Sequence, residues 1–587
     1  MNFLLVAINA KYIHSNPAVY SLCAYAKKVA GAEVSIAEYT INQRMQDMLS
    51  DIYKRKPDAI GLSCYIWNWG MIQELLAELP KLLPKTDIWL GGPEVSYDGP
   101  AVLQQFPQVK GIMVGEGEET FRELVEWYAK GKASDADKIP GLFLPGGYTP
   151  VREPMDMNKL PFLYEELETF QNRIVYYESS RGCPYRCSYC LSSIEKKVRL
   201  REIAIVKKEL QFFLDHGVKQ VKFVDRTFNC DHTHAMEIWQ YIKEHDNGVT
   251  NFHFEISADI LREDEIVLLR TLRPGLAQLE IGVQSVNLQT LAAINRRMDV
   301  ERLEQIVAAL RRGNNIHLHL DLIAGLPYED YDSFVMSFNK VYGMKPEQLQ
   351  LGFLKVLKGS PMAEKAAEYG INYLDRAPYE VLFTNWLSYE DVVRLKRIEE
   401  MVELYYNSNQ FAHTLAVLEQ VFDSPFRMYE ALADFYERKG YFVESPSRAY
   451  RYQVLLQFAA EHDKEREALY RELLIYDMYL RENLKSRPEF ASNLFEQDAC
   501  KEYMREFYRC EEQERVYLPE YVSYDKRQLS KMTHLEPFRY PVWEMGADTG
   551  CNNICYVLFD YQERNPLTYE ARVEVICPGE EKWEKHD

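Results

Sequence analysis

The stretch SSRGCPYRCSYCLSS, residues 179–193, holds three of the eleven cysteines of the chain in the spacing C-x3-C-x2-C. A structural zinc site usually needs four ligands in pairs of cysteines, and no second pair follows Cys183, Cys187 and Cys190 nearby. Buried free cysteines would not lie in a polar loop that contains glycine and proline. Three thiolates at short spacing instead predict an iron–sulfur cluster, in which one iron keeps an open coordination site.

Six β-prone segments alternate with helical segments around and after this loop. They read RIVYYESS, VKFVD, FHFEIS, AQLEIGV, IHLHLDLI and LQLGFLK, and the cysteines follow directly after the first. Strands that alternate with helices predict a parallel sheet, and six such units predict a partial (β/α)6 barrel over residues 173–380. Because the carboxyl ends of barrel strands carry the chemistry, the cysteine loop lies at an expected active-site position.

Residues 1–140 show the same alternation with shorter strands, expected at 3–8, 33–39, 59–65, 87–92 and 111–118. This pattern predicts an α/β fold with a doubly wound, Rossmann-like sheet. No G-x-G-x-x-G motif follows the first strand, so the domain is not predicted to bind a dinucleotide. Residues 141–172, rich in proline and glycine, are expected to be a linker.

Residues 381–587 are expected to form a mainly α-helical domain with a β-prone tail. Leu395, Ile398 and Val402 recur at helical spacing, and no glycine occurs between Tyr441 and Met545. Two roles remain open for this domain, a cap over the barrel mouth and an oligomerisation module. Cys551, Cys555 and Cys577, near the C-terminus, could ligate a second metal, although free cysteines are the commoner interpretation.

The composition is that of an ordinary globular protein, and the length indicates several domains. Hydrophobic residues make up 47% of the 587 residues and charged residues 27%, with a formal net charge of −20. That charge disfavours an extended nucleic-acid interface. The sequence shows neither a signal peptide nor an apolar run of about 20 residues that could cross a membrane. The odd number of cysteines suits a reducing compartment, so a cytoplasmic location without a disulfide framework is expected.

The cysteine motif, with the aromatic Tyr189 before its last cysteine, resembles the signature of the radical S-adenosylmethionine (SAM) superfamily over about residues 173–360. The resemblance implies that Cys183, Cys187 and Cys190 hold a [4Fe-4S] cluster whose open iron chelates SAM. Transfer of an electron to SAM then gives a 5′-deoxyadenosyl radical. An electron donor such as a flavodoxin or ferredoxin is implied as a partner.

The same resemblance implies further contacts with SAM at the strand ends. FVDRTF replaces the glycine-glycine-glutamate pattern of the family, so Asp225 and the backbone beside it would receive the ammonium group. In LEIGVQS, Gln284 and Ser285 would contact the ribose. In DLIAGLPYE, Ile323, Gly325 and Glu329 would surround the adenine. For each residue the alternative is a strand-end side chain that only satisfies backbone groups.

Three loops of the N-terminal sheet resemble the cobalamin (B12)-binding domain of the B12-dependent branch of this superfamily. SCYIWN, LGGPE and VGEGEE follow the third, fourth and fifth expected strands. Small residues at such strand ends let the backbone approach a large flat macrocycle and its nucleotide tail. The implied contacts are Ser63, Tyr65, Trp67, Asn68, Gly91, Gly92, Pro93, Glu94, Gly115, Glu116 and Gly117.

The motif D-x-H-x-x-G, through which many B12 proteins bind cobalt, is absent, and none of the twelve histidines lies on these loops. The lower face of the cobalt is therefore expected to lack a histidine ligand and to be covered by Tyr65 or Trp67. His14, after the first strand, could contact the corrin or its tail. A capping or packing role is the alternative for His14.

The resemblance implies a cobalamin-dependent radical SAM enzyme, foremost a methyltransferase that acts on an unactivated carbon of a small-molecule or peptide substrate. A cyclase, oxidase or rearrangement enzyme with the same cofactors is the second hypothesis. A methylthiotransferase is less expected, because its N-terminal domain would carry cluster cysteines and this one offers only Cys23 and Cys64. A non-catalytic cobalamin sensor would lack the SAM motifs that follow the cysteines in order.

Overall fold

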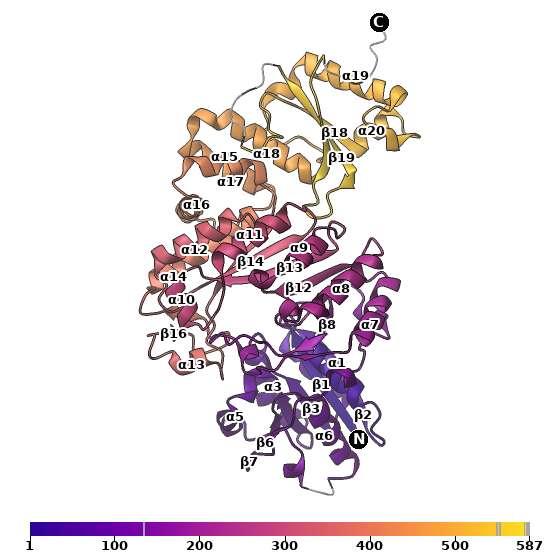
Figure 1. Cartoon of the computed structure of the whole chain (residues 1–587), viewed down its shortest axis with the longest axis vertical. Coiled ribbons are helices and arrows are strands. Elements are labelled where there is room, and N and C mark those ends of the chain that lie inside the picture. Colours follow the sequence, from indigo (N-terminus) through magenta and orange to yellow (C-terminus); the bar gives the residue numbers. More distant parts are fainter. Residues whose placement is uncertain (133–134, 547–549, 551–552, 580–581, 583–587) are drawn as a thin grey trace. The chain divides into compact units, whose positions relative to one another are not determined.

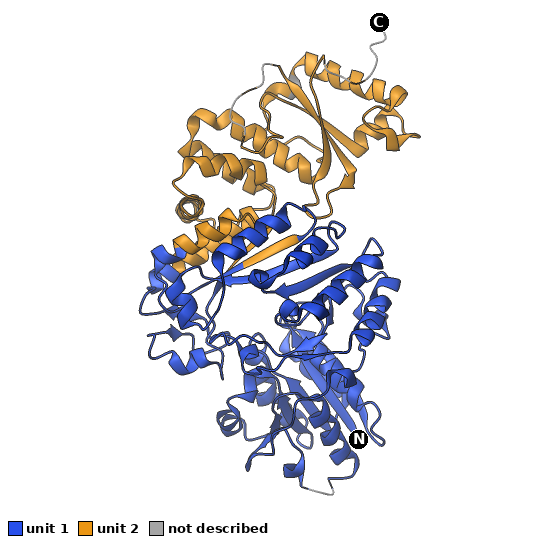
Figure 2. Cartoon of the chain, viewed as in Figure 1, with its two compact units in different colours: residues 1–316, 321–334, 352–392 blue, residues 317–320, 335–351, 393–587 orange. Residues whose placement is uncertain are grey.

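The structure is a computed structural model that describes residues 1–132, 135–546, 550, 553–579 and 582 (Figure 1). The chain divides into two compact units, which Figure 2 shows in different colours. The first unit contains residues 1–316, 321–334 and 352–392, and the second contains residues 317–320, 335–351 and 393–587. The three boundaries between the four segments predicted from the sequence remain predictions.

The N-terminal part of the first unit is a doubly wound sheet, as predicted. Its strands are β1 (Asn2–Asn9), β2 (Glu33–Thr40), β3 (Ala59–Ser63), β4 (Asp87–Gly91) and β5 (Val109–Met113), parallel and in the order β2-β1-β3-β4-β5. The antiparallel strands β6 (Leu142–Leu144) and β7 (Gly147–Tyr148) extend the β5 edge. The strand order reverses between β1 and β3, where sheets of this kind bind ligands.

Both faces of this sheet are buried. On β1, Leu4, Val6 and Ile8 belong to one hydrophobic core, whereas Phe3 and Leu5 belong to another. The helices between the strands are α1 (Pro17–Ala26), α2 (Met45–Arg55), α3 (Trp69–Leu82), α4 (Pro93–Ser96), α5 (Gly99–Gln105) and α6 (Glu118–Ala129). Burial on both faces explains why β1 reads as a continuous apolar run and not as an alternating one.

The six predicted barrel strands form one sheet in sequential order, which confirms the partial barrel. They are β8 (Val175–Tyr177), β11 (Gln220–Phe223), β12 (Asn251–Ile256), β13 (Ala277–Gln284), β14 (His317–Ala324) and β15 (Gln348–Phe353). The helices between them include α7 (Ile203–Asp215), α8 (His232–Glu244), α9 (Glu263–Leu269), α10 (Leu288–Ala293), α11 (Val300–Arg311) and α12 (Tyr331–Gly343). A short antiparallel ribbon of β9 (Ser180–Arg181) and β10 (Arg199–Leu200) brackets the cysteine loop.

The second unit is mainly helical with a β-sheet near its end, as predicted. Its helices include α15 (Ala412–Leu418), α16 (Pro425–Lys439), α17 (Tyr450–His462), α18 (Glu467–Arg481), α19 (Asp498–Glu514) and α20 (Lys526–Met532). The strands β18 (Thr533–Phe538), β19 (Cys555–Arg564) and β20 (Ala571–Ile576) pair in antiparallel fashion. In the part of the chain that is described, no helix is long and apolar enough to cross a membrane.

The structure corrects the expectation for the C-terminal cysteines. Cys555 and Cys577 form a disulfide bond, because the β19–β20 register, which pairs Tyr556 with Ile576, brings them together. Cys551 lies outside the described residues. A second metal site built on these three residues therefore loses two of its thiolates, and the expectation that all cysteines are free is also wrong.

Candidate active site

The loop between β9 and β10 presents the three motif cysteines. Cys183 and Cys187 are buried, and Cys190 is half-buried. Gly182 opens the loop with a φ of 97°, a left-handed conformation that favours glycine. A side chain there would come within 2.5 Å of the Lys197 carbonyl oxygen, so the turn into the loop requires glycine.

The separation of the three sulfurs distinguishes two kinds of metal site. A single zinc ion, with Zn–S bonds of about 2.3 Å, would draw its sulfurs to within about 4 Å of one another. The ligand atoms of Cys183, Cys187 and Cys190 do not all lie within 4.8 Å of one another in the described structure. This wider spacing fits ligands of three separate irons in one cluster.

Polar groups surround the cysteine sulfurs. The Cys183 Sγ lies 3.4 Å from the Thr227 hydroxyl, and the Cys187 Sγ lies 3.7 Å from Nη1 of Arg296. Burial raises the pKa of the Cys187 thiol, and the Arg296 charge opposes that rise. Tyr189, predicted at the SAM site, is half-buried, and burial raises the pKa of its hydroxyl beside Cys187.

Asp225, the predicted partner of the SAM ammonium, holds the strand that enters the cysteine loop. Its carboxylate accepts from the Ser179 backbone N–H at 3.0 Å and from the hydroxyls of Ser179 and Ser180 at 2.6 Å each. The His234 ring lies 3.1 Å from the Ser179 hydroxyl. Serine groups therefore donate to both carboxylate oxygens, and contact of the SAM ammonium with Asp225 and the backbone beside it stays a prediction.

Gln284, predicted at the ribose, ends β13 with a left-handed φ of 73°. Its side-chain Oε1 is buried without a hydrogen-bond partner among the described residues. Such an unsatisfied group is costly unless a ligand pairs with it. The left-handed φ and the unpaired Oε1 of Gln284 are typical of a residue that binds a polar ligand.

The ribose and adenine motifs lie together, although they are far apart in sequence. The Ser285 hydroxyl donates to Glu329 Oε1 at 2.6 Å, and both residues are buried. Gly325 has a φ of 88°, and a side chain there would come within 2.7 Å of Val381. Ile323 packs against the core cluster around Leu326. The structure brings the two motifs together, and their contacts with SAM remain predictions.

A cavity of about 760 Å³ in the first unit connects the N-terminal loops with the cysteine loop. One part of its wall comes from the ends of β3, β4 and β5, and another from the ends of β8 and β11 and the flanks of the cysteine motif. The predicted cobalamin residues that line it are Ser63, Tyr65, Gly91, Gly92, Pro93, Gly115, Glu116 and Gly117. No histidine is among its described lining residues, and the absence of a histidine ligand to cobalt stays a prediction.

The loop after β3 is fixed by Asn68 and presents two stacked aromatic rings. The Asn68 side chain accepts from Tyr65 N and donates to the carbonyl oxygens of Ile8 and Ser63, all within 3.0 Å. The rings of Tyr65 and Trp67 stack with centroids 4.3 Å apart. Tyr65 lines the cavity, whereas the exposed Trp67 is not among the lining residues and its indole N–H donates to the Ile8 carbonyl oxygen.

Glu94, a predicted cobalamin contact, is engaged elsewhere. Its carboxylate accepts from the Tyr379 hydroxyl and pairs with Lys358 at 3.3 Å. Burial raises the pKa of Glu94, although Tyr379 and Lys358 oppose the rise. These contacts join the loop after β4 to the segment after β15, so Glu94 acts in the packing of the first unit.

Glutamates of the loop after β5 pair with arginines that flank the cysteine motif. Glu118 accepts from Arg181 at 2.6 Å, and Glu116 pairs with Arg199 and, at 3.5 Å, with Arg181. Burial raises the pKa of Glu116, but the hydrogen bond from Arg199 and the charge of Arg181 lower it overall. Sequence reasoning did not single out these arginines, because nothing in the order of residues signals the pairing.

His14 lies at the edge of the cavity. Its Nδ1 is 2.5 Å from the hydroxyl of Tyr176, which lines the cavity. Burial lowers the pKa of His14. The packing alternative therefore describes His14 in the structure, and contact with a corrin remains a prediction.

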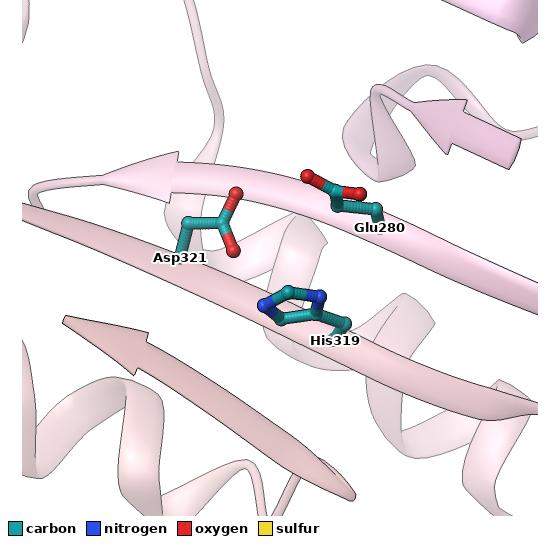
Figure 3. Close-up of side chains that lie close together, drawn as sticks. All are labelled: Glu280, His319 and Asp321. Atoms are coloured by element: carbon teal, nitrogen blue, oxygen red, sulfur yellow. The ribbon is translucent and has the colours of Figure 1, made fainter. Parts of the chain in front are cut away.

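Figure 3 shows a further group on neighbouring strands, Glu280 of β13 with His319 and Asp321 of β14. Their candidate ligand atoms lie within 4.8 Å of one another. Glu280 also lies 2.9 Å from the His253 ring and accepts from Lys222 at 3.1 Å. A lysine charge thus compensates the Glu280 carboxylate.

Comparison with known families agrees with this geometry. Residues 4–125 match the B12 binding domain, residues 177–341 match the radical SAM superfamily, and residues 367–559 match a protein family of unknown function, DUF4080. The chain thus combines a B12 binding domain with a radical SAM domain.

Curated relatives are similar to this chain at low identity. The cobalamin-dependent radical SAM methyltransferase TokK of Streptomyces tokunonensis is 26% identical over 373 residues, which are 57% of this chain and 52% of TokK. The anaerobic magnesium-protoporphyrin IX monomethyl ester cyclase of Rubrivivax gelatinosus is 22% identical over 56% of this chain and 61% of the cyclase. The chain thus spans only about half to two-thirds of these relatives.

A solved structure shares the fold over most of the chain. The cobalamin-dependent S-adenosylmethionine radical enzyme OxsB, with aqua-cobalamin and S-adenosylmethionine bound, matches 89% of this chain and 81% of its own with a TM-score of 0.55. Its sequence identity is 15%, so this likeness concerns the fold alone.

Proposed function

We propose that this chain is a cobalamin-dependent radical SAM methyltransferase that acts on an unactivated carbon. The observation that carries the proposal is the cavity in which the loops after β3, β4 and β5 meet the flanks of the cysteine motif. Methylation of such a carbon needs a hydrogen-abstracting radical and a methyl donor within reach of the same atom. A single cavity next to both cofactor sites meets that requirement.

The residues of the chain have separate roles in this proposal. Cys183, Cys187 and Cys190 would hold the [4Fe-4S] cluster, and Gln284 would bind SAM. Gly92 and Gly115 would let the backbone approach the corrin. When bound, the cofactors would supply an electron for SAM cleavage and a transferable methyl group. An electron donor such as a flavodoxin or ferredoxin, and with it a cytoplasmic location, belongs to the same proposal.

The test separates the two uses of SAM without knowledge of the substrate. The full chain, reconstituted anaerobically with iron, sulfide and cobalamin, is incubated with methyl-labelled SAM and a reductant. We expect the label in protein-bound cobalamin together with S-adenosylhomocysteine, and 5′-deoxyadenosine from cleavage at the cluster. Products are quantified by chromatography with mass spectrometry.

The triple variant C183A/C187A/C190A is the control for the cluster. It should lose the iron and the deoxyadenosine, but keep cobalamin, because the lining residues of the cavity remain. Deoxyadenosine formed by the triple variant would exclude the assignment of the cysteines. A wild-type chain that binds cobalamin but never labels it would exclude methyl transfer.

A cyclase or oxidase is the second candidate, supported by the similarity to the magnesium-protoporphyrin cyclase. Such a reaction needs the radical but no methyl donor. With the true substrate, methyl transfer should give deoxyadenosine and S-adenosylhomocysteine in roughly equal amounts. Deoxyadenosine without matching S-adenosylhomocysteine would favour the second candidate.

A further inference from the structure

A basic segment with exposed lysines follows the cysteine motif. Residues 184–200 hold four basic side chains and one acidic one, although the whole chain has a formal net charge of −20. Lys196 and Lys197 are exposed, and so is Arg186 within the motif. In the described part of the chain, none of these three side chains makes an ion pair.

The basic residues that come next in the sequence are already held by carboxylates. The pairs are Arg199 with Glu116 and Glu195, Arg201 with Glu209, and Lys207 with Glu237. Lys207 lies on α7, where an ordinary solvated helix face explains its charge. Lys196 and Lys197 lie outside any helix, between the cysteine motif and β10, so that explanation does not apply to them.

The segment with the two lysines packs against the start of the cysteine loop. The Cys183 N–H donates to the Glu195 carbonyl oxygen at 3.3 Å. A Cβ on Gly182 would lie 2.5 Å from the Lys197 carbonyl oxygen. The backbone that carries the lysines thus touches a predicted cluster ligand and its neighbour. An electron that arrives at this surface would have only a short path to the cluster.

Exposed apolar side chains flank the two lysines in the sequence. Ile194 is 43% exposed and Leu200 is 37% exposed. Short-lived complexes between redox proteins have small interfaces, below about 1,200 Å², and charges at their rim speed the encounter. Positive charge next to small apolar contacts therefore fits a small partner with a negative surface.

We propose that Ile194, Lys196, Lys197 and Leu200 form the docking surface for an acidic electron-donor protein of the flavodoxin or ferredoxin kind. The inference rests on the proposed function in one respect, that the motif cysteines hold a cluster that must be reduced. One electron passes from the donor to the cluster, and no proton is transferred. Because the chain as a whole is acidic, it repels such a donor elsewhere, and the two lysines orient the encounter.

The first test measures binding and requires no turnover. A fluorescently labelled flavodoxin is titrated with the reconstituted full chain at low salt, and fluorescence anisotropy gives the Kd. We expect K196E/K197E to raise the Kd about tenfold, and added salt to weaken the wild-type complex. K27E/K28E is the matched control, because Lys27 and Lys28 are consecutive exposed lysines after α1 and the change in net charge is the same. This control should bind like the wild type.

The second test measures electron delivery as 5′-deoxyadenosine formed from SAM. With flavodoxin below saturation, K196E/K197E should form it about tenfold more slowly than the wild type. With photoreduced 5-deazariboflavin, a small uncharged reductant, the two rates should be equal. K196Q/K197Q removes the charges without reversing them, and its rate with flavodoxin should lie between the two. It also replaces the glutamate variant if that variant does not fold.

Iron and cobalamin contents are measured before either test. Lysine variants that bind flavodoxin and accept its electrons like the wild type would overturn the inference. An equal loss of rate with deazariboflavin would also overturn it, because the lysines would then serve the cluster itself. So would an equal effect of K27E/K28E, because only the net charge would then matter.

Two further outcomes separate the alternatives. Weaker binding of SAM or cobalamin by K196E/K197E, with unchanged binding of flavodoxin, would overturn the inference and assign the lysines to a small anion. A wild-type chain that takes up no iron would refute the proposed function. The binding test needs no cluster, so it would still decide whether the lysines receive an acidic protein.

Discussion

Asp225 is a single residue whose titration should be visible in the stability of the chain. Burial raises the pKa of its carboxyl group from 3.8 to about 7, and the hydrogen bonds from Ser179 and Ser180 only reduce that rise. The folded state therefore binds this proton more tightly than the unfolded chain does. Stability from this group is fully present at low pH and is lost as the pH rises from about 4 to about 7.

The variant D225N removes this titration and keeps the shape of the side chain. We expect the Tm of D225N to rise relative to that of the wild type as the pH increases from about 4 to about 7, because only the wild type then buries a charge. Scanning fluorimetry at several pH values measures the difference. A difference between the two Tm values that does not change with pH would contradict the shifted pKa of Asp225.

The cysteines and the partners of Asp225 differ in how well the sequence predicts them. Cys183, Cys187 and Cys190 lie on one loop, so their spacing alone indicates a shared ligand. Asp225 was predicted from the resemblance of FVDRTF to a family motif, but its partners Ser179 and Ser180 lie about 45 residues earlier, after β8 and at the start of β9. Arg296 carries no signal at all, because its contact with Cys187 depends on how α10 ends near the loop.

At the scale of elements, the turn from β4 into α4 should tolerate no side chain. Gly92 has φ 112° and ψ 169°, a region almost exclusive to glycine, and a Cβ there would lie 2.4 Å from the Cys64 carbonyl oxygen. We expect G92A to destabilise the chain by about 1–3 kcal/mol from backbone strain, with more from the clash. Cobalamin affinity should fall as well, since Gly92 lines the cavity.

The matched control is G70A in α3, where a side chain would meet nothing within 4 Å. Alanine is favoured over glycine in a helix, so G70A should be neutral or slightly stabilising. Thermal unfolding and titration with cobalamin measure both variants. If G92A and G70A changed the Tm and the cobalamin affinity equally, the turn at Gly92 would be able to accommodate a side chain.

Most strands could be predicted because their apolar runs are long and regularly spaced. β1, β3 and β4 of the first sheet and β12 to β14 of the barrel were expected from such runs. The antiparallel hairpin of β6 and β7 was missed, since its residues read as a proline- and glycine-rich linker. The Cys555–Cys577 bond was missed because it depends on the register of β19 and β20, which the sequence alone does not determine.

At the scale of the molecule, buried ion pairs join the two sheets of the first unit. Arg181 precedes the cysteine motif and pairs with Glu118, and both side chains are largely shielded from water. Removal of one partner leaves the other buried with less compensation. We expect E118Q to lower stability by about 1–3 kcal/mol, less than for an isolated buried pair because Glu178 also pairs with Arg181.

The control is E126Q on the same helix, α6. Glu126 pairs with Arg122 one helical turn away and is about one-third exposed. Such helical pairs contribute only about 0.3–0.5 kcal/mol. Denaturant unfolding of both variants measures the difference. If E126Q lowered the free energy of unfolding as much as E118Q does, the buried ion pairs would stabilise the chain no more than an ordinary helical pair.

The arginine–glutamate pairs also have a consequence for the recombination of domains between relatives. A chimera that takes residues 1–140 from another protein would bring new side chains to positions 116 and 118. Arg181 and Arg199 would then face unsuitable neighbours at the entrance to the cysteine loop. The N-terminal sheet and the cysteine loop should therefore be inherited together. In a designed chimera they should also be exchanged together.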